Sequence, residues 1–333
     1  MAFKDIRGQD LAIKLLTGYM KQGKLTGSYL FIGPEGIGKK ITALTVAKAL
    51  NCQVNKFDSC DKCASCLKID KNGHPDVHLI ESQASEAIKI EYVRQMRNAV
   101  NLKPYEAKKK VFIIDDAHNL TQEAANSLLK VLEEPGPNNV IILVTAVPSL
   151  LPKTAISRCK LIKFSALGRV ELENFLKDDF SLPKDKAHFL AYYSQGRIGS
   201  ALALKDSTLL KDKNRVIDEF IFQRQSTGAA NFLSEPNKAM SMETRNRVNL
   251  RNQLNILASW FRDIYFIKIG LPHSELINYD CREKLLKEMA KYSFFELDEI
   301  LKFISDSLSY IEQNVNVKLL VSNLKSELWK KGF

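Results

Sequence analysis

The first stretch able to do chemistry is the glycine-rich segment "GPEGIGKK", which begins at Gly33. It matches the phosphate-binding pattern G-x-x-x-x-G-K-[ST] at every position except the last. In that pattern glycines let backbone N–H groups surround phosphates, the lysine pairs with the outer phosphates, and the Ser/Thr hydroxyl holds magnesium. Gly33, Gly36, Gly38 and Lys39 therefore form a predicted phosphate cradle, whereas Lys40 stands where the hydroxyl belongs.

Two carboxylates complete this first constellation. The apolar run "VFII" leads directly into Asp115 and Asp116. A carboxylate at such a strand end completes a magnesium shell, and a glutamate beside it positions the attacking water. Asp116 is shorter than glutamate by one methylene, about 1.5 Å, and a misplacement of about 1 Å can cost on the order of 100-fold in rate. The pattern predicts nucleotide-binding ancestry without hydrolysis, and leaves open whether the surviving cradle and Lys39 still bind a nucleotide.

A second constellation consists of four cysteines within fifteen residues: Cys52, Cys60, Cys63 and Cys66. In a reducing compartment such a cluster indicates metal binding rather than disulfides. Four thiolates fill a tetrahedral shell and leave no position for water, so the favoured ion is a structural zinc. An iron–sulfur cluster uses the same ligands, and unliganded thiols are the third alternative.

The overall composition is that of a soluble globular chain. Its 333 residues are 45% hydrophobic and 26% charged, which suggests two or three domains. The longest apolar run, "VIILVTAV", is too short to cross a bilayer, so we predict a cytoplasmic protein without membrane contact. The net charge of +11 indicates either contact with phosphate backbones or a solvated surface, because Lys and Arg are spread along the chain.

The elements that must position these residues alternate between strand and helix. The patterns predict strands at 27–33, within 108–120 just before the two aspartates, and at 139–146, and helices at 41–50, 90–100 and 122–134, the last capped by Thr121. This order is typical of a parallel sheet covered on both faces, with ligands at the carboxyl ends of the strands. Beyond about residue 165 the strands stop, and amphipathic helical patterns continue to the end.

Several motifs taken together resemble a known family over nearly the whole chain. They are "GSYLFIGPEGIGKK", "LNC" with the cysteines, "HPDVHLI", "AANSLLKVLEEP" and "SRC" at 157–159. This set is similar to the AAA+ subunits of the bacterial replication clamp loader. The resemblance implies an α/β AAA+ P-loop domain with a parallel sheet over 1–165, carrying a zinc insertion at about 52–66. A small helical lid over 166–207 and an all-α collar, or oligomerisation, domain over 208–333 would follow.

The resemblance also implies roles for single residues. Arg158 of "SRC" would be an arginine finger acting in trans on the ATP of a neighbouring subunit, and Thr145 occupies the place of a first γ-phosphate sensor. Gly199 stands where a second sensor carries its arginine. The spacing between Cys52 and Cys60 is one residue shorter than is usual in the family, which leaves ligation by Cys52 open.

The departures decide between the function hypotheses. Lys40, Asp116 and Gly199 all depart from a working ATPase, which favours a non-hydrolysing stator subunit that is not an enzyme on its own and puts magnesium–ATP in doubt. The alternatives are a gamma/tau-like motor ATPase of the same loader and a zinc-dependent nucleic-acid-binding module, although Phe57 is the only aromatic residue in the cysteine segment. Implied partners are the motor (gamma/tau) and delta subunits in a pentameric ring, with the sliding clamp and primed DNA reached through the complex.

Overall fold

The computed structural model describes residues 1–81, 87–206, 209–218, 242–313, 315 and 319–320. The chain divides into two compact units. The first comprises residues 1–172 with 195–200, and the second comprises 173–194 with 201–333. An α/β domain followed by a helical region confirms the expected fold class, whereas the three-domain boundaries at 165 and 207 remain a prediction.

The first unit is built on one parallel sheet of five strands in the order β2-β3-β4-β1-β5. The strands are β1 (Gly27–Ile32), β2 (Val77–Ile80), β3 (Lys110–Ile114), β4 (Asn139–Thr145) and β5 (Lys160–Lys163). Three of them were predicted, and the edge strands β2 and β5 are additional. Because Ile32 pairs with Thr145 and Ile114 with Leu143, the strands end at the same edge of the sheet. The glycine loop and the two aspartates follow that edge.

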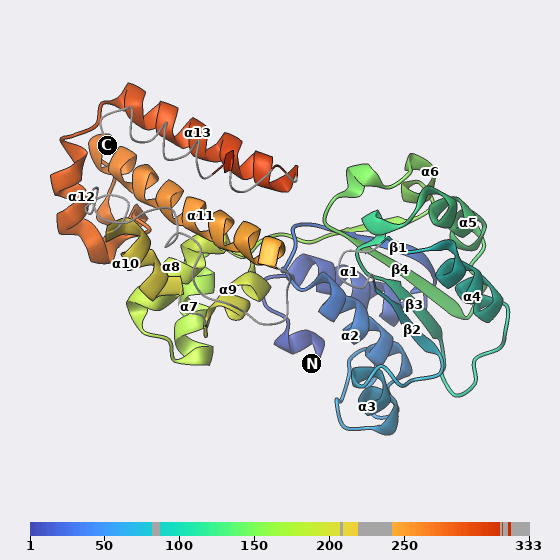
Figure 1. Cartoon of the computed structure of the whole chain (residues 1–333). Helices are drawn as coiled ribbons and strands as arrows, with labels where there is room; N and C mark the ends of the chain where they lie inside the picture. Colours follow the sequence, from blue (N-terminus) through green and yellow to red (C-terminus); the bar gives the residue numbers. More distant parts are fainter. Residues whose placement is uncertain (82–86, 207–208, 219–241, 314, 316–318, 321–333) are drawn as a thin grey trace. The chain divides into compact units, whose positions relative to one another are not determined.

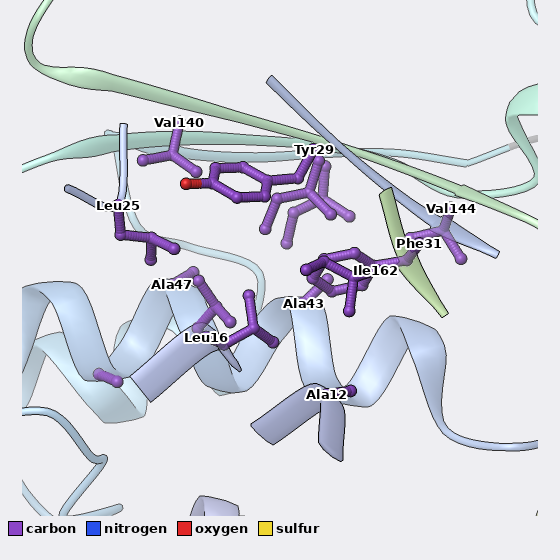
Figure 2. Packing of buried hydrophobic residues seen from close by; sticks show 14 of the residues in the cluster. Ala12, Leu16, Leu25, Tyr29, Phe31, Ala43, Ala47, Val140, Val144 and Ile162 are labelled. Atoms are coloured by element: carbon purple, nitrogen blue, oxygen red, sulfur yellow. The ribbon is translucent and has the colours of Figure 1, made fainter. Parts of the chain in front are cut away.

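Helices cover both faces of the sheet (Figure 1). The four covering helices are α1 (Asp10–Lys21), α2 (Lys39–Asn51), α4 (Ile90–Val100) and α5 (Gln122–Glu133). Strand side chains alternate between the faces: Tyr29 and Phe31 pack with α1 and α2, whereas Leu30 packs with α4 and α5. Figure 2 shows the first of these layers, with Tyr29 and Phe31 on the strand side and Leu16 and Ala43 on the helix side. Burial of these apolar side chains fixes the helices that hold the site residues.

The remaining helices form most of the described part of the second unit, and α3 and α6 belong to the first unit. They are α3 (Ala64–Asp70), α6 (Lys153–Ile156), α7 (Arg169–Phe180), α8 (Lys184–Tyr193), α9 (Ile198–Leu204), α10 (Leu209–Ile217), α11 (Met242–Lys268), α12 (Arg282–Met289) and α13 (Phe294–Glu312). In the second unit α11 packs against α10, α12 and α13, with Trp260 fully buried. Of the predicted collar over 208–333, residues 208, 219–241, 314, 316–318 and 321–333 lie outside the described residues. Across the described part of the chain, no helix combines the length and apolarity needed to span a membrane.

The predicted cap at Thr121 and the three consecutive lysines "KKK" at 108–110 both have defined places. The Thr121 hydroxyl accepts a hydrogen bond from the Ala124 N–H, which confirms the expected cap. The "KKK" run is bound internally, because each ammonium donates to a carbonyl oxygen of a different segment. The pairs are Lys108 with Cys52 at 2.9 Å, Lys109 with Pro137 at 2.6 Å and Lys110 with Ala99 at 2.9 Å. The run therefore joins segments of the fold and does not form a basic patch of unengaged ammonium groups.

Asp76, in "HPDVHLI", anchors the segment that leads into β3. Its carboxylate is buried and accepts backbone N–H groups of Tyr105, Glu106 and Ala107 at 2.8 to 2.9 Å. Burial favours the neutral acid, but these N–H groups outweigh it and lower the pKa of Asp76. The charge on Asp76 therefore stabilises the fold above the unfolded-state pKa of about 3.9, and this contribution is lost as pH falls through the lower folded-state value.

We expect Asp76→Asn to lower the free energy of unfolding by about 2–3 kcal/mol at pH 7, because the amide NH₂ must face at least one backbone N–H. Urea unfolding followed by circular dichroism measures the loss, and the difference from the wild type should shrink below pH 4. Asp10→Asn, at an exposed position in the first turn of α1, is the matched control and should cost at most about 0.5 kcal/mol. Equal stabilities of the Asp76 variant and the control would contradict this role.

Candidate functional site

The glycine loop joins β1 to α2 and has the backbone conformation that a phosphate cradle needs. Gly33, Gly36 and Gly38 all have positive φ, at 150°, 74° and 94°. A Cβ at Gly33 would lie 2.4 Å from the carbonyl oxygen of Phe164, so no larger residue fits there. The predicted cradle residues are therefore brought together in one turn at the N-terminus of α2.

Lys39, the phosphate-pairing lysine of the pattern, turns back into its own loop. Its ammonium donates to the carbonyl oxygens of Gly33 at 2.7 Å and Pro34 at 2.6 Å. Burial lowers the pKa of Lys39, although Asp115 and Asp116 act in the opposite direction. The Lys39 ammonium is thus engaged by the loop carbonyls, and a phosphate that binds it would have to replace these hydrogen bonds.

Lys40 lies where the departure from the pattern predicted a positive charge. Its Nζ is 2.8 Å from Oε1 of Glu81 and 3.5 Å from Oδ2 of Asp115. Burial opposes the charge on Lys40, but Glu81 and Asp115 outweigh it and raise its pKa. Burial and the neighbouring Asp116 raise the pKa of Asp115 in spite of Lys40. An ammonium therefore contacts the carboxylate that a magnesium ion would use.

Glu81 was missed by the sequence reasoning because it follows β2, an edge strand that was not predicted. In hindsight the signal was the short apolar run "VHLI" ending in a carboxylate at 81. Parallel strands bring such residues to one edge of the sheet. The missing partner of Lys40 therefore became visible only with the strand order.

Thr145 and Asp116, the other two residues assigned to this edge, have local roles. Thr145 is fully buried, its hydroxyl lies 3.2 Å from Nδ1 of His118, and it accepts the Val147 N–H at 3.1 Å. Asp116 has a left-handed backbone, with φ of 47°. That conformation is uncommon outside glycine and asparagine and fixes the direction of the turn after β3.

Gly199 lies directly against the glycine loop. Its N–H donates to the carbonyl oxygen of Gly36 at 2.7 Å. A Cβ at Gly199 would lie 2.8 Å from that oxygen and 3.2 Å from the Gly36 Cα, contacts too short for a side chain. Restoring an arginine at 199 would therefore push the 195–200 segment away from the loop. The 195–200 segment therefore packs its backbone against the glycine loop at this position.

Arg158 is held away from the loop, at the junction of α5 and α6. Its Nε donates to Oε2 of Glu133 at 3.0 Å, and its Nη1 donates to the carbonyl oxygen of Thr154 at 3.0 Å. The Arg158 side chain is 33% exposed. The structure therefore divides the predicted residues into the loop group, the cysteines, and Arg158 in its own surface position.

The four cysteines converge on one point. The sulfur atoms of Cys52, Cys60, Cys63 and Cys66 all lie within 4.8 Å of one another. Four thiols at this separation fit a single tetrahedral ion such as zinc, and Cys52 belongs to the set despite the shortened spacing. Backbone hydrogen bonds outweigh burial and lower the pKa of Cys63 to about 6, whereas burial raises the pKa of Cys66 to about 12.

The cysteine segment is tied to α2 by a buried lysine. The Lys48 side chain is 2% exposed, and its ammonium lies 2.6 Å from Asp61 and 3.0 Å from Asp70. Burial opposes ionisation of Asp61, but the bonds from Lys48 and Ser59 help to lower its pKa to about 2. Removing one partner would leave a buried charge without compensation, which is strongly destabilising. The cysteine segment is therefore a fixed part of the first unit.

Comparisons with known proteins cover most of the chain. The family model described as DNA polymerase III, delta subunit, matches residues 8–168, and that of its C terminal matches residues 208–326. DNA polymerase III subunit delta' of Bacillus subtilis is 27% identical over 316 residues, which are 95% of this chain and 94% of the relative. The tau subunit of B. subtilis is 33% identical over 274 residues, or 78% of this chain and 47% of the longer relative.

Among solved structures, a DNA polymerase III gamma subunit-related protein from Thermotoga maritima aligns over 96% of this chain and 99% of that chain. Its TM-score is 0.47 at 16% identity, a likeness too small to carry an argument about function.

Proposed function

Because this chain belongs to the DNA polymerase III delta-subunit family and is a clamp-loader subunit, we propose that it acts as the delta-prime stator. In this role it does not hydrolyse ATP and offers Arg158 to the ATP of a neighbouring motor subunit. The motor (gamma/tau) and delta subunits would complete a pentameric ring with it, and the ring would load the sliding clamp onto primed DNA.

The contact of Lys40 with Asp115 carries this proposal. A magnesium ion bridges the phosphates in P-loop enzymes and neutralises the charge that develops during transfer. Here the Lys40 ammonium forms ion pairs with Asp115 and Glu81. A protonated lysine has no lone pair and cannot itself act as a ligand for the ion. Asp116, one methylene shorter than the glutamate of the pattern, and the backbone contact of Gly199 with Gly36 also support a loop that does not hydrolyse ATP.

The surface position of Arg158 supports the second half of the proposal. Within the described part of the chain, Glu133 and Thr154 engage two of its five N–H groups, one on Nε and one on Nη1. The Nη2 amine would then be available for an oxygen of a neighbour's phosphate. A guanidinium at this place would stabilise the charge on the equatorial oxygens during phosphoryl transfer. The chain would thus act on a nucleotide that the loop of the neighbouring motor subunit holds.

The cysteine cluster would hold a structural zinc in the same proposal. Four thiolate ligands close the coordination shell, so the ion would supply folding free energy rather than a reactive water. The ion would connect the end of α2 with α3 and leave the glycine loop untouched. Its place in the molecule is far along α2 from Lys39, because Cys52 is the residue after that helix ends.

The test is ATP turnover by the purified chain, compared with its Lys39→Ala variant. We expect both to give the same residual rate, because the loop of this chain does not turn over ATP. Addition of the motor subunit, clamp and primed DNA should then produce turnover that depends on the motor's own loop. Turnover by the isolated chain that disappears in Lys39→Ala would instead establish the gamma/tau-like motor function.

A further inference from the structure

The contact between Arg158 and Glu133 has the geometry of an orienting clamp. Glu133 is the last residue of α5, and its Oε2 takes the Nε–H of Arg158 at 3.0 Å. The Thr154 carbonyl takes one Nη1–H from the other side. One bond uses Nε and the other uses the terminal nitrogen Nη1, and the contacts of the described residues engage neither N–H of Nη2. Both N–H groups of Nη2 are therefore left for a phosphate oxygen.

The support behind Glu133 is rigid. In α5 the side chains of Leu128, Val131 and Leu132 are buried in the cluster that also contains Ala155 of α6. The Leu132 carbonyl, one residue before Glu133, accepts a buried hydrogen bond from the Ser28 hydroxyl of β1 at 2.9 Å. The sheet therefore fixes the helix that carries the carboxylate and also the helix that carries the carbonyl.

The placement of Glu133 is unfavourable for the helix alone. A carboxylate in the last turn of a helix faces the negative end of the helix dipole, which is unfavourable. Its side chain is 59% exposed, and exposed ion pairs add little to stability. The contribution of Glu133 to folding stability therefore does not account for a carboxylate at this position. The orientation of the long, flexible Arg158 side chain does.

From this geometry we infer that Glu133 is a positioning residue for Arg158: it holds the guanidinium in the direction of the neighbouring nucleotide before that subunit docks. An arginine side chain has many rotamers and loses entropy when it is held in one of them, and a displacement of about 1 Å can cost on the order of 100-fold in rate. Fixing the side chain in advance removes part of both costs. The inference rests on the proposed function and concerns the same site.

The test uses the assembled loader with clamp and primed DNA, and follows phosphate release in a single turnover. We expect Glu133→Ala to slow the phase that depends on Arg158 about 10-fold, with the half-saturating ATP concentration changed less than twofold. Glu133→Gln keeps one acceptor and should give an intermediate loss of about threefold. Glu134→Ala removes the same charge from the adjacent exposed position and should stay within twofold of the wild type.

A second background separates positioning from general damage. In an Arg158→Ala loader, Glu133→Ala should add no further loss, because its effect passes through Arg158. The inference would be overturned if Glu133→Ala, in a loader that retains Arg158, hydrolysed ATP as fast as the wild type or faster. It would also be overturned if Glu133→Ala caused the same loss in the Arg158→Ala background as in the background with Arg158. If Arg158→Ala slows hydrolysis and Glu133→Ala does not, the positioning role fails and the proposed function stands. If Arg158→Ala has no effect, both fail.

Discussion

Arg158→Ala should slow ATP hydrolysis at one nucleotide site of the assembled loader by about 10³-fold, the lower end of what arginine fingers contribute in other phosphoryl-transfer systems. The reason is electrostatic: in the proposed role the guanidinium would add its positive charge, in a site closed to water, to the charge that magnesium and the loop lysine of the motor subunit supply. Arg158→Lys should recover little, because an ammonium cannot reproduce the planar pair of N–H donors. Single-turnover phosphate release in the complete loader measures the slow site directly.

The matched control for this prediction is Arg97→Ala, which removes an exposed arginine from α4 in the same unit. It should leave both the rate and the assembly unchanged. Arg158→Ala should also leave the unfolding temperature of the isolated chain nearly unchanged, because its ion pair with Glu133 is exposed. Unchanged hydrolysis in a correctly assembled Arg158→Ala loader would exclude a finger at this position.

Cys66→Ser should lower the affinity for zinc by more than 100-fold. Apparent binding free energies of structural zinc are about 10–16 kcal/mol, so losing one of four equivalent ligands costs about 3 kcal/mol. Cys66 is fully buried between the other three sulfurs, which prevents water from replacing it easily. Metal analysis of the purified chain should find about one zinc for the wild type, and a competing chelator should remove it far more readily from the variant.

Cys281→Ser is the control for the metal prediction, because Cys281 lies in the second unit and outside the cluster. It should keep about one zinc per chain. The Cys66 variant should also lose protection of the amides over residues 52–66 in hydrogen exchange, since those residues are held by the ion and by Lys48. A wild-type chain that binds no zinc, or a zinc-free variant that keeps the full protection of the wild type, would contradict a structural metal.

The sequence predicted the parts of the fold that carry strong periodicity. The three buried strands and the helices over 90–100 and 122–133 follow directly from continuous apolar runs and helical spacing. The edge strands β2 and β5 escaped prediction because they are four residues long and only partly buried. Residues just after such strands are then also missed, which is why Glu81 had no assigned role.

Within the site, residue types were predictable and side-chain partners were not. The glycine pattern identified the loop and Lys40, and the cysteine spacing identified the cluster, because both depend on local chain geometry. The bond of Glu133 to Arg158 joins residues 25 apart through the packing of α5 against α6, and periodicity does not describe such packing. The close approach of Gly199 to Gly36 likewise depends on how distant backbone segments meet.

The ion pair of Lys40 has a consequence for exchange with the surrounding solution. A magnesium ion leaves and enters its site according to its concentration and to the charge of the bound nucleotide, whereas Lys40 is attached to the chain and has a fixed, high effective concentration beside Asp115. The charge at this edge of the sheet therefore does not change with the magnesium level, with chelators or with the ratio of ATP to ADP. In the proposed stator role, this subunit would keep one charge state while its neighbours exchange nucleotide.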